Sequence, residues 1–397
     1  MSGASIAGEV NPSIGTTARV GQNTVMKNVL GVIFSNMHDH MVSELTNRRC
    51  MGSIPVGGRY RLIDFALSSM ANAGIEDVGV ITKSNYQSLM DHLGNGREWD
   101  LSRKRGGLVI LPPFGRMDST GMYHNRVEAL AGVMDFIRAS QAEHMLITDC
   151  DYIANVDYTE LMESHFQSGA DISLLFKKVR LEGEGSKDVC TFALDKDNNV
   201  IDMLIHNQIS GEQNVYLNTM FVSRNLLERL IVDCYSRNLT SFDKDVLQAG
   251  IGKYKVHACE FTGYAGRIDS MKSFFNANMA MMDGDVRKSL FPQDRPVYTK
   301  IRDEAPVRYG LDSNVRSCLL GDGCVIEGEI ENSILFRGVK VEKGAKVRNC
   351  IIMQGTTIGA GSNLEYVVTD KDVTVAENRM VMGFETYPVY VSKGSVV

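Results

Sequence analysis

The 397-residue chain lacks several features that would assign it directly to a class of protein. It has no apolar run near the ~20 residues that a membrane span requires, and its first residues lack the charged and apolar regions of a secretory signal. With 42 Lys and Arg against 48 Asp and Glu, its net charge of −6 gives no basic footprint for nucleic acid. We therefore expect a cytoplasmic protein that binds neither a membrane nor nucleic acid.

The cysteines also lack the spacing of a metal or redox site. Eight of them are scattered from Cys50 to Cys350, and no two form a C-x-x-C pair, which argues against a zinc ribbon and a thioredoxin-like centre. We expect them to be reduced thiols. Hydrophobic residues make up 44% of the chain and charged residues 23%, which is ordinary for a folded protein and excludes disorder as its main state.

Strand-like and helix-like segments alternate from residue 28 to about residue 282. This alternation predicts an α/β fold, a Rossmann-like, mostly parallel sheet covered by helices, which becomes mixed after residue 200. Buried strands are expected at Val29–Ser35, Val78–Thr82, Met145–Thr148 and Ile172–Val179, with a hairpin over residues 192–205. Helices are expected at Asp64–Ala73, Val127–Ala139, Tyr158–Ser168, 224–236 and 269–282.

Residues 311–376 follow a different pattern, in which short apolar runs recur about every six residues. Three phased runs keep this step, and the phase slips by one residue between them: Cys318, Cys324 and Ile330; Leu335, Val341 and Val347; Ile352, Ile358 and Leu364. A six-residue repeat of inward aliphatic side chains is typical of a β-helix, and ordinary antiparallel hairpins are the alternative. Three of the eight prolines fall within residues 283–310, where we expect the domain boundary.

These patterns predict three parts of the chain. Residues 1–25, rich in Gly, Ser, Thr and Asn, are expected to be a flexible leader or an added extension outside the fold. Residues 26–290 are expected to form the α/β domain. Residues 291–397 are expected to form a linker and the β-helix.

The segment from Pro55 to Ser69, PVGGRYRLIDFALSS, resembles the ADP-glucose pyrophosphorylase (glucose-1-phosphate adenylyltransferase) family. The similarity continues through NAGI at 72–75, VGVIT at 78–82, GGLVILPP at 106–113 and Asp151-Tyr-Ile. The resemblance implies a GT-A-like nucleotidyltransferase domain followed by a left-handed β-helix. It also implies a reaction that joins ATP to glucose 1-phosphate and releases pyrophosphate, with Mg²⁺ held by carboxylates.

The loop expected to cradle phosphate departs from the family pattern. The family has G-G-x-G-x-R-L after the first strand, whereas this chain has NMHDHMV over residues 36–42, with Met41 where the arginine should be. Side chains at Asn36, Met37 and Asp39 would crowd the phosphate, and the carboxylate of Asp39 would repel it.

The histidines of this loop admit a second interpretation. His38 and His40 with Asp39 could form a metal cluster, but side chains at i and i+2 of a tight loop rarely converge. A solvated loop is therefore favoured.

Other family positions have changed as well. By resemblance, the phosphate-binding lysine becomes Met51, the sugar-phosphate lysine becomes Asn207, and the second metal-binding aspartate becomes Arg267. The adenine-side Gly-Thr becomes Asn125-Arg126. Only the first metal-binding aspartate remains, as Asp151. We therefore expect no intact catalytic site and no metal or cofactor bound by this chain, with Mg²⁺ held by a catalytic partner.

The chain keeps the structural motifs of the family but has lost most of the catalytic ones. In this it resembles the GlgD-type regulatory subunits of the family. The resemblance implies a homologous catalytic subunit as partner, in a hetero-oligomer expected to be a tetramer, and a sugar-phosphate or glycolytic-acid effector. Arg48, Arg49 and Arg61 are the candidate anion site, because guanidinium groups suit phosphate. A solvated loop or an interface salt bridge is the alternative there, and the run Arg103–Arg105 is expected to be a solvated loop.

Three other functions stay open. The chain could be an active nucleotidyltransferase with a rebuilt loop, or a scaffold that binds no small molecule. It could also be a hexapeptide acyltransferase, but such enzymes place a histidine between β-helix coils, and no histidine follows His257.

Overall fold

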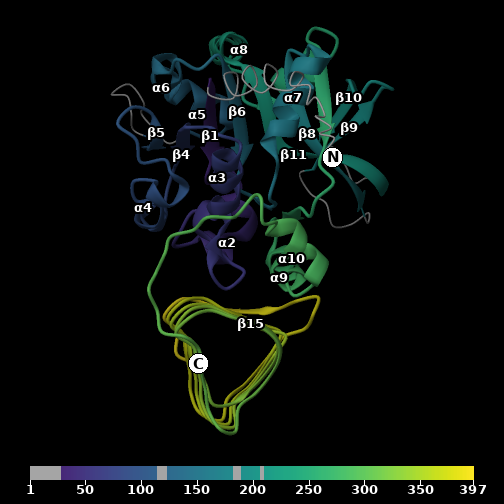
Figure 1. Ribbon diagram of the computed structural model, residues 1–397. Coiled ribbons are helices and arrows are strands. Elements are labelled where there is room, and N and C mark those ends of the chain that lie inside the picture. The colour runs from purple at the N-terminus through teal and green to yellow at the C-terminus, as the bar shows by residue number, and fades with distance from the viewer. Residues whose placement is uncertain (1–27, 114–122, 182–188, 206–209) are drawn as a thin grey trace, which may run out of the picture.

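The computed structural model describes residues 28–113, 123–181, 189–205 and 210–397. The expected leader, residues 1–25, lies outside these ranges. Figure 1 shows an α/β domain above a β-helix, which is viewed end-on as a triangle. A linker without helix or strand, residues 291–307, runs from the first part to the second.

A nine-stranded mixed sheet forms the centre of the α/β domain. The parallel part consists of β1 (Val29–Phe34), β4 (Asp77–Ile81), β5 (Gly107–Leu111) and β6 (His144–Asp149). All six residues of β1 are buried, because helices cover both faces of the sheet. The remaining strands are β8 (Ile172–Leu181), β9 (Cys190–Leu194), β10 (Val200–Ile205), β11 (Gly211–Ser223) and β12 (Val256–Glu260). β11 is antiparallel to β6, β8 and β9, so the sheet becomes mixed after residue 200, as predicted.

The helices largely match their predicted positions. Asp157 caps α7 (Tyr158–Ser168), and Gly169, at a φ of +59°, ends it. The helix expected over Val127–Ala139 is instead divided at Val133 into α5 (Arg126–Gly132) and α6 (Met134–Ala139). The other helices are α2 (Ser43–Thr46), α3 (Leu62–Asn72), α4 (Gln87–Leu93), α8 (Arg224–Ser236), α9 (Met271–Ala280) and α10 (Gly284–Leu290). Among the described helices, none has the length and apolar character to cross a membrane.

Two short strand pairs position the sites discussed below. β7 (Tyr152–Ile153) pairs antiparallel with β13 (Gly266–Arg267), which brings the chain around residue 267 next to the end of β6. β2 (Pro55–Val56) and β3 (Tyr60–Arg61) form a hairpin whose turn contains Gly57 and Gly58, both at positive φ. A side chain at Gly58 would lie 3.4 Å from the Leu335 carbonyl oxygen of the β-helix, so this turn rests on the second domain.

The C-terminal strands all pair in parallel, which confirms a β-helix and excludes antiparallel hairpins. Thr357 pairs with Lys340 on one side and Thr374 on the other, so one coil contains 17 residues. Three hexapeptides less one residue give this length, which explains why the phase slips by one.

The β-helix has three faces. The first contains β14 (Arg308–Tyr309), β16 (Val325–Ile326), β18 (Lys340–Val341), β21 (Thr357–Ile358) and β24 (Thr374–Val375). β15 (Asn314–Leu320) and β17 (Glu329–Leu335) pass through a corner. Their first halves form the second face with β19 (Lys346–Arg348), β22 (Asn363–Glu365) and β25 (Met380–Met382). Their second halves form the third face with β20 (Ile351–Ile352), β23 (Val367–Thr369) and β26 (Val389–Val391).

The third face of the β-helix packs against the α/β domain. Ile334, Ile351 and Val368 belong to the same buried apolar cluster as Phe65 and Phe275 of the α/β domain. A buried ion pair crosses the junction, in which Arg49 Nη2 lies 2.6 Å and 2.7 Å from the two carboxylate oxygens of Asp370. The two domains are therefore joined by both apolar burial and a buried charge pair.

Candidate functional site

The carboxylates expected at a nucleotidyltransferase site lie at the end of β6. Asp149 is its last residue and pairs with Phe34, the last residue of β1. Because parallel strands end at the same sheet edge, the loop that follows β1 meets Asp149 and Asp151 there. Both aspartates are buried, at 6% and 1% exposure.

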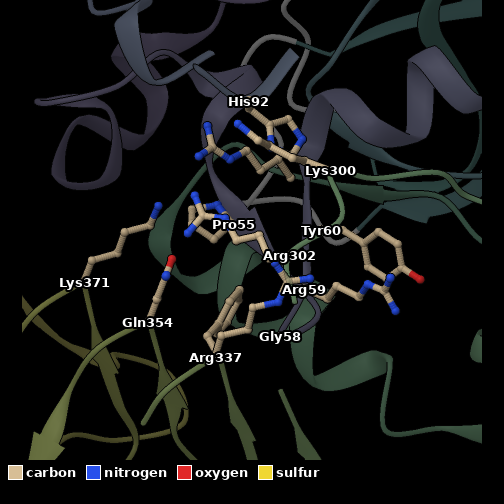
Figure 2. A pocket seen from close by; sticks show the side chains of 12 residues that line it. Pro55, Gly58, Arg59, Tyr60, His92, Lys300, Arg302, Arg337, Gln354 and Lys371 are labelled. Carbon is tan, nitrogen blue, oxygen red and sulfur yellow. The ribbon is translucent and has the colours of Figure 1, made fainter. Parts of the chain in front are cut away.

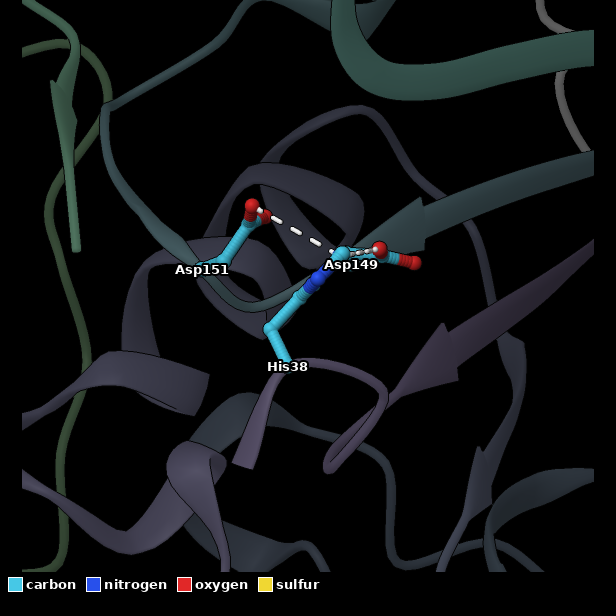
Figure 3. A group of neighbouring side chains, drawn as sticks. All are labelled: His38, Asp149 and Asp151. Atoms are coloured by element: carbon cyan, nitrogen blue, oxygen red, sulfur yellow. Dashed lines mark hydrogen bonds and ion pairs between the residues drawn. The ribbon is translucent and has the colours of Figure 1, made fainter. Parts of the chain in front are cut away.

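The loop after β1 folds onto these carboxylates. His38 Nε2 lies 2.7 Å from Asp149 Oδ2 and 3.8 Å from Asp151 Oδ2 (Figure 3). Asp39 Oδ1 accepts a hydrogen bond from the Met51 backbone N–H at 2.7 Å, and only His40 of the trio is exposed. The expectation of a solvated loop is therefore wrong for His38 and Asp39, whose side chains find buried partners.

The potential metal ligands differ from the cluster considered from the sequence. His38, Asp149 and Asp151 present ligand atoms within 4.8 Å of one another, whereas Asp39 and His40 are not part of this group. Three such ligands could suit a divalent cation. Two arginines, however, lie against the same carboxylates.

Arg126 is the first of these cations. Its Nη2 contacts Asp149 Oδ2, and its Nη1 lies 3.0 Å from Asp243 Oδ1. Asn125, which caps α5 by accepting from the Glu128 N–H, fixes the start of the helix that carries Arg126. Where the resemblance implies a small Gly-Thr pair, this chain has a helix cap and a cation that reaches Asp149.

Arg267 is the second cation. Through the pairing of β13 with β7, its Nε lies 3.8 Å from Asp151 Oδ2, and its Nη1 lies 3.8 Å from Asp269 Oδ2. Asn218 donates to the same Asp151 oxygen at 2.9 Å. Where the resemblance implies a second metal-binding carboxylate, Arg267 therefore places a positive charge beside Asp151.

These contacts set the protonation of the cluster. Burial opposes ionisation of Asp149, but Arg126 and His38 outweigh it and lower the pKa of its carboxyl. Burial likewise disfavours a charged His38, but Asp151 and Asp149 raise the pKa of its imidazole. Arg126 and His38 both contact Asp149 Oδ2 and leave its Oδ1 without a hydrogen-bond partner. Their positive charges would repel a divalent cation at this carboxylate, so the residues present fit Mg²⁺ poorly.

The other degenerate positions serve packing. Met51 is 1% exposed in the apolar core, and Met41 packs against the same core. Asn36 is buried and accepts a hydrogen bond from the Tyr123 hydroxyl at 2.9 Å. Met37 packs against the second apolar cluster of the domain. Asn207 lies outside the described residues.

The three arginines considered as an anion site are brought together only in part, because Arg49 lies near enough to Arg61 to act on its charge. Arg49 is held by Asp370, and Arg48 is exposed and does not line the pocket between the domains. Arg61 lines that pocket, although its Nη1 donates to the Ser88 carbonyl oxygen and hydroxyl at 2.5 and 3.0 Å. In the Arg103–Arg105 run, which is exposed, Arg103 pairs with Glu76 and Asp100.

The pocket between the domains gathers more cations than the sequence suggested. It has an empty volume of about 440 Å³, open to solvent. Its cationic side chains come from the β2–β3 hairpin, the linker and the β-helix (Figure 2). They are Arg59, Arg61, Lys300, Arg302, Arg337 and Lys371. None of the described residues that line this pocket is acidic.

These cations lower one another's pKa. Burial, followed by the charges of Arg61 and Arg49, lowers the pKa of Lys371 to about 7. Burial and nearby arginines also lower the pKa of Arg337, and burial with Arg49 and Arg302 outweighs Asp64 and brings the pKa of Arg61 to about 10. A negatively charged ligand would relieve this repulsion. Linker and β-helix cations lie too far from the hairpin in sequence for any local motif to have revealed the pocket.

Comparison with known proteins agrees with this architecture. The nucleotidyl transferase family model matches residues 41–185, and the GlmU-like C-terminal hexapeptide model matches residues 305–387. The glycogen biosynthesis protein GlgD of Bacillus subtilis (strain 168) is 33% identical over 373 residues, covering 93% of this chain and 96% of its own. Glucose-1-phosphate adenylyltransferase of Bacillus cereus (strain Q1) is 29% identical, covering 86% and 91%. The chain therefore belongs to the glucose-1-phosphate adenylyltransferase family and is similar to its GlgD members.

Proposed function

We propose that this chain is a catalytically deficient regulatory subunit of a glucose-1-phosphate adenylyltransferase in bacterial glycogen biosynthesis. The observation that carries the proposal is the contact of Arg126 and His38 with Asp149. In a working site that carboxylate edge would face Mg²⁺ and the triphosphate. Here the chain's own cations occupy it.

The energetic argument concerns what substrate binding would have to break. Arg126 bridges two aspartates, and its side chain is only 12% exposed. Removing one partner of such a buried pair costs about 3–5 kcal/mol. A metal nucleotide would have to offset that cost and would also meet the guanidinium of Arg267. We infer that ATP turnover by this chain is negligible.

The proposed regulatory role uses the pocket between the domains. Six cationic side chains without an acidic neighbour in the lining suit a ligand with more than one negative group, such as a sugar phosphate or a glycolytic acid. Because the pocket takes side chains from both domains and the linker, a bound anion would bias their relative arrangement. A homologous catalytic subunit in a hetero-oligomer, expected to be a tetramer, would respond to that bias.

The test compares this chain alone, the catalytic homologue alone and their mixture, with pyrophosphate release measured from ATP, Mg²⁺ and glucose 1-phosphate. We expect no turnover from this chain and a changed effector response of about 5- to 150-fold in affinity in the mixture. Identical effector curves with and without this chain, and no complex on a sizing column, would contradict the proposal.

One observation supports a second candidate, an active nucleotidyltransferase. Asp151 is retained, and together with His38 and Asp149 it offers three ligand atoms in one place. The same assay on this chain alone, repeated with Mn²⁺ in place of Mg²⁺, separates the two candidates. Turnover near the typical enzyme median of ~10 s⁻¹ would favour the active enzyme.

A further inference from the structure

The second face of the β-helix carries two outward columns of side chains. Its strands are parallel and in register, and the residues between the columns, including Ile330, Val347 and Leu364, are buried. One column contains Arg316, Glu331, Arg348 and Glu365, and the other contains Asn314, Glu329, Lys346 and Asn363. We name these eight residues the charge ladder.

The order of charges in the charge ladder has a particular symmetry. The first column alternates positive, negative, positive, negative, and the second runs neutral, negative, positive, neutral. Reading either column backwards exchanges every positive with a negative position. Each column is therefore the electrostatic complement of its own reversal.

The ion pairs that these charged residues form within one chain are long and exposed, so the side chains can also contact a partner. Lys346 Nζ lies 3.7 Å from Glu329 Oε2, and Arg348 Nε lies 3.6 Å from Glu331 Oε2. The four side chains are 47% to 56% exposed. Exposed ion pairs of this kind contribute only about 0–1 kcal/mol. Desolvation by a facing surface would strengthen them.

We propose that the charge ladder binds the same face of a second copy of this chain, around a two-fold axis that runs along the strands between β17 and β19. The axis reverses the order of the strands in the copy. Arg316 then faces the partner's Glu365, Glu331 faces the partner's Arg348, and Glu329 faces the partner's Lys346. Such a surface is self-complementary, as a closed two-fold interface requires.

The pattern also disfavours neighbouring registers. An axis lying on β19 would set Arg348 against the partner's Arg348 and Glu331 against the partner's Glu365. An axis lying on β17 would set Glu331 against the partner's Glu331. Like charges face each other in both cases, so the charge ladder specifies one register by repulsion as well as by attraction.

Apolar residues extend the interface beyond the charges. In β25, the next strand of the face, the two columns end in Met380 and Met382, which are 70% and 49% exposed. The two-fold pairing places this strand of each copy past the partner's β15, which among the described strands pairs only with β17. Four strands at ~4.8 Å spacing make a narrow surface, whereas a standard interface buries ~800 Å² per partner, so these two methionines supply needed apolar area.

The test uses two charge-exchange variants of the full chain. The double variant Arg316→Glu with Glu331→Arg puts like charges opposite each other throughout the first column. Adding Arg348→Glu and Glu365→Arg exchanges all four charges, which restores complementarity with itself and preserves the alternation within the chain. This fourfold variant faces like charges when it meets the natural chain.

Mass is measured by light scattering on a sizing column at low salt, because salt screens exposed charges. We expect an assembly for the natural chain, half that mass for the double variant and the original mass for the fourfold variant. Differently tagged natural and fourfold chains, co-expressed, should not co-purify through this face. Circular dichroism of the double variant checks that it is folded.

A natural chain that is monomeric at micromolar concentration would overturn the proposal, as would a folded double variant that keeps the natural mass. A fourfold variant that stays dissociated, or that co-purifies with the natural chain as well as with itself, would overturn it too. The last comparison holds even if the double variant does not fold. None of these measurements depends on the proposed regulatory function, because none uses catalysis or effectors.

Discussion

The carboxylate cluster at the end of β6 and the pocket between the domains both gather charged side chains, but they handle charge in opposite ways. At β6, Asp149 meets Arg126 and His38, so its negative charge is neutralised within the chain. In the pocket, cations face one another and the described lining contains no acidic residue. A cation has little to gain by binding at the first site, whereas an anion bound in the pocket would relieve the repulsion among its cations.

Counting charged residues therefore does not identify a binding site. Asp149 keeps the acidic character of a metal site, yet Arg126 and His38 supply the positive charge that a metal would supply. For Asp151, burial and the charge of Asp149 outweigh the nearby cations and raise the pKa of its carboxyl. Lys371 shows the reverse, because burial and the neighbouring Arg61 and Arg49 lower its pKa to about 7, and an anion would raise it again. Whether the chain compensates a charge decides what can bind from outside.

The largest expected effect concerns catalysis at the carboxylate cluster at the end of β6. Purified alone, the chain should form ADP-glucose at least ~10³-fold more slowly than the enzyme median of ~10 s⁻¹, because Arg126 and Arg267 hold the carboxylates. Pyrophosphate release with ATP, Mg²⁺ and glucose 1-phosphate measures this. Glycines introduced over residues 36–42 should not restore activity, since both arginines remain. Rescue by those glycines alone would mean that the two arginines are not the obstacle.

The next effect concerns the buried ion pair between Arg49 and Asp370 at the junction of the two domains. Arg49→Met should lower the free energy of unfolding by about 3–5 kcal/mol, because Asp370 would stay buried without its cationic partner. Denaturant titration followed by circular dichroism measures it. Adding Asp370→Asn should recover part of the loss, since the amide carries no charge. Arg48→Met, at the exposed neighbouring position, is the matched control and should change stability by less than ~0.5 kcal/mol.

Much of the fold could be predicted from the sequence, because strands such as β1 and helices such as α7 carry strong local patterns and caps. The β-helix followed from its six-residue step. The site was harder. Arg267 and Asp151 could be related only through family positions, and the contact of His38 with Asp149 depends on a loop whose residues look solvated. The cationic pocket depends on Lys300, Arg337 and Lys371, which only the docking of the two domains brings together.

A smaller effect is expected when the pocket loses a cation. Arg302→Ala should weaken the affinity for a sugar-phosphate effector roughly 10- to 100-fold, since a hydrogen bond to a charged group contributes about 1.5–3 kcal/mol. Effector titration of the mixed complex measures it, and the complex should stay intact on a sizing column. Arg48→Ala is again the control, because Arg48 does not line the pocket. Equal effector affinity in both variants would place the effector elsewhere.

The smallest effect is a pH dependence of anion binding that only the pocket between the domains should show. Lys371, with a pKa of about 7, is mostly protonated at pH 6 and mostly neutral at pH 8. Anion binding favours the protonated form, so affinity for sulfate, whose own charge is constant in this range, should fall several-fold between pH 6 and pH 8. Sulfate-dependent thermal shifts measure it.

The sign of the linked stability change follows from the same pKa. Without an anion, the folded chain binds fewer protons at Lys371 than the unfolded chain does between pH 7 and the ordinary lysine value of about 10.5, so this group makes stability rise with pH there. Sulfate should reduce that rise, because it raises the pKa of the bound-state lysine. Lys371→Met should flatten both dependences, whereas Lys343→Met, in an exposed turn of the β-helix, should leave them unchanged. If the natural chain binds sulfate equally at pH 6 and pH 8, Lys371 is not one of the groups that hold the anion, and the contrast between the two sites would rest on the arginines alone.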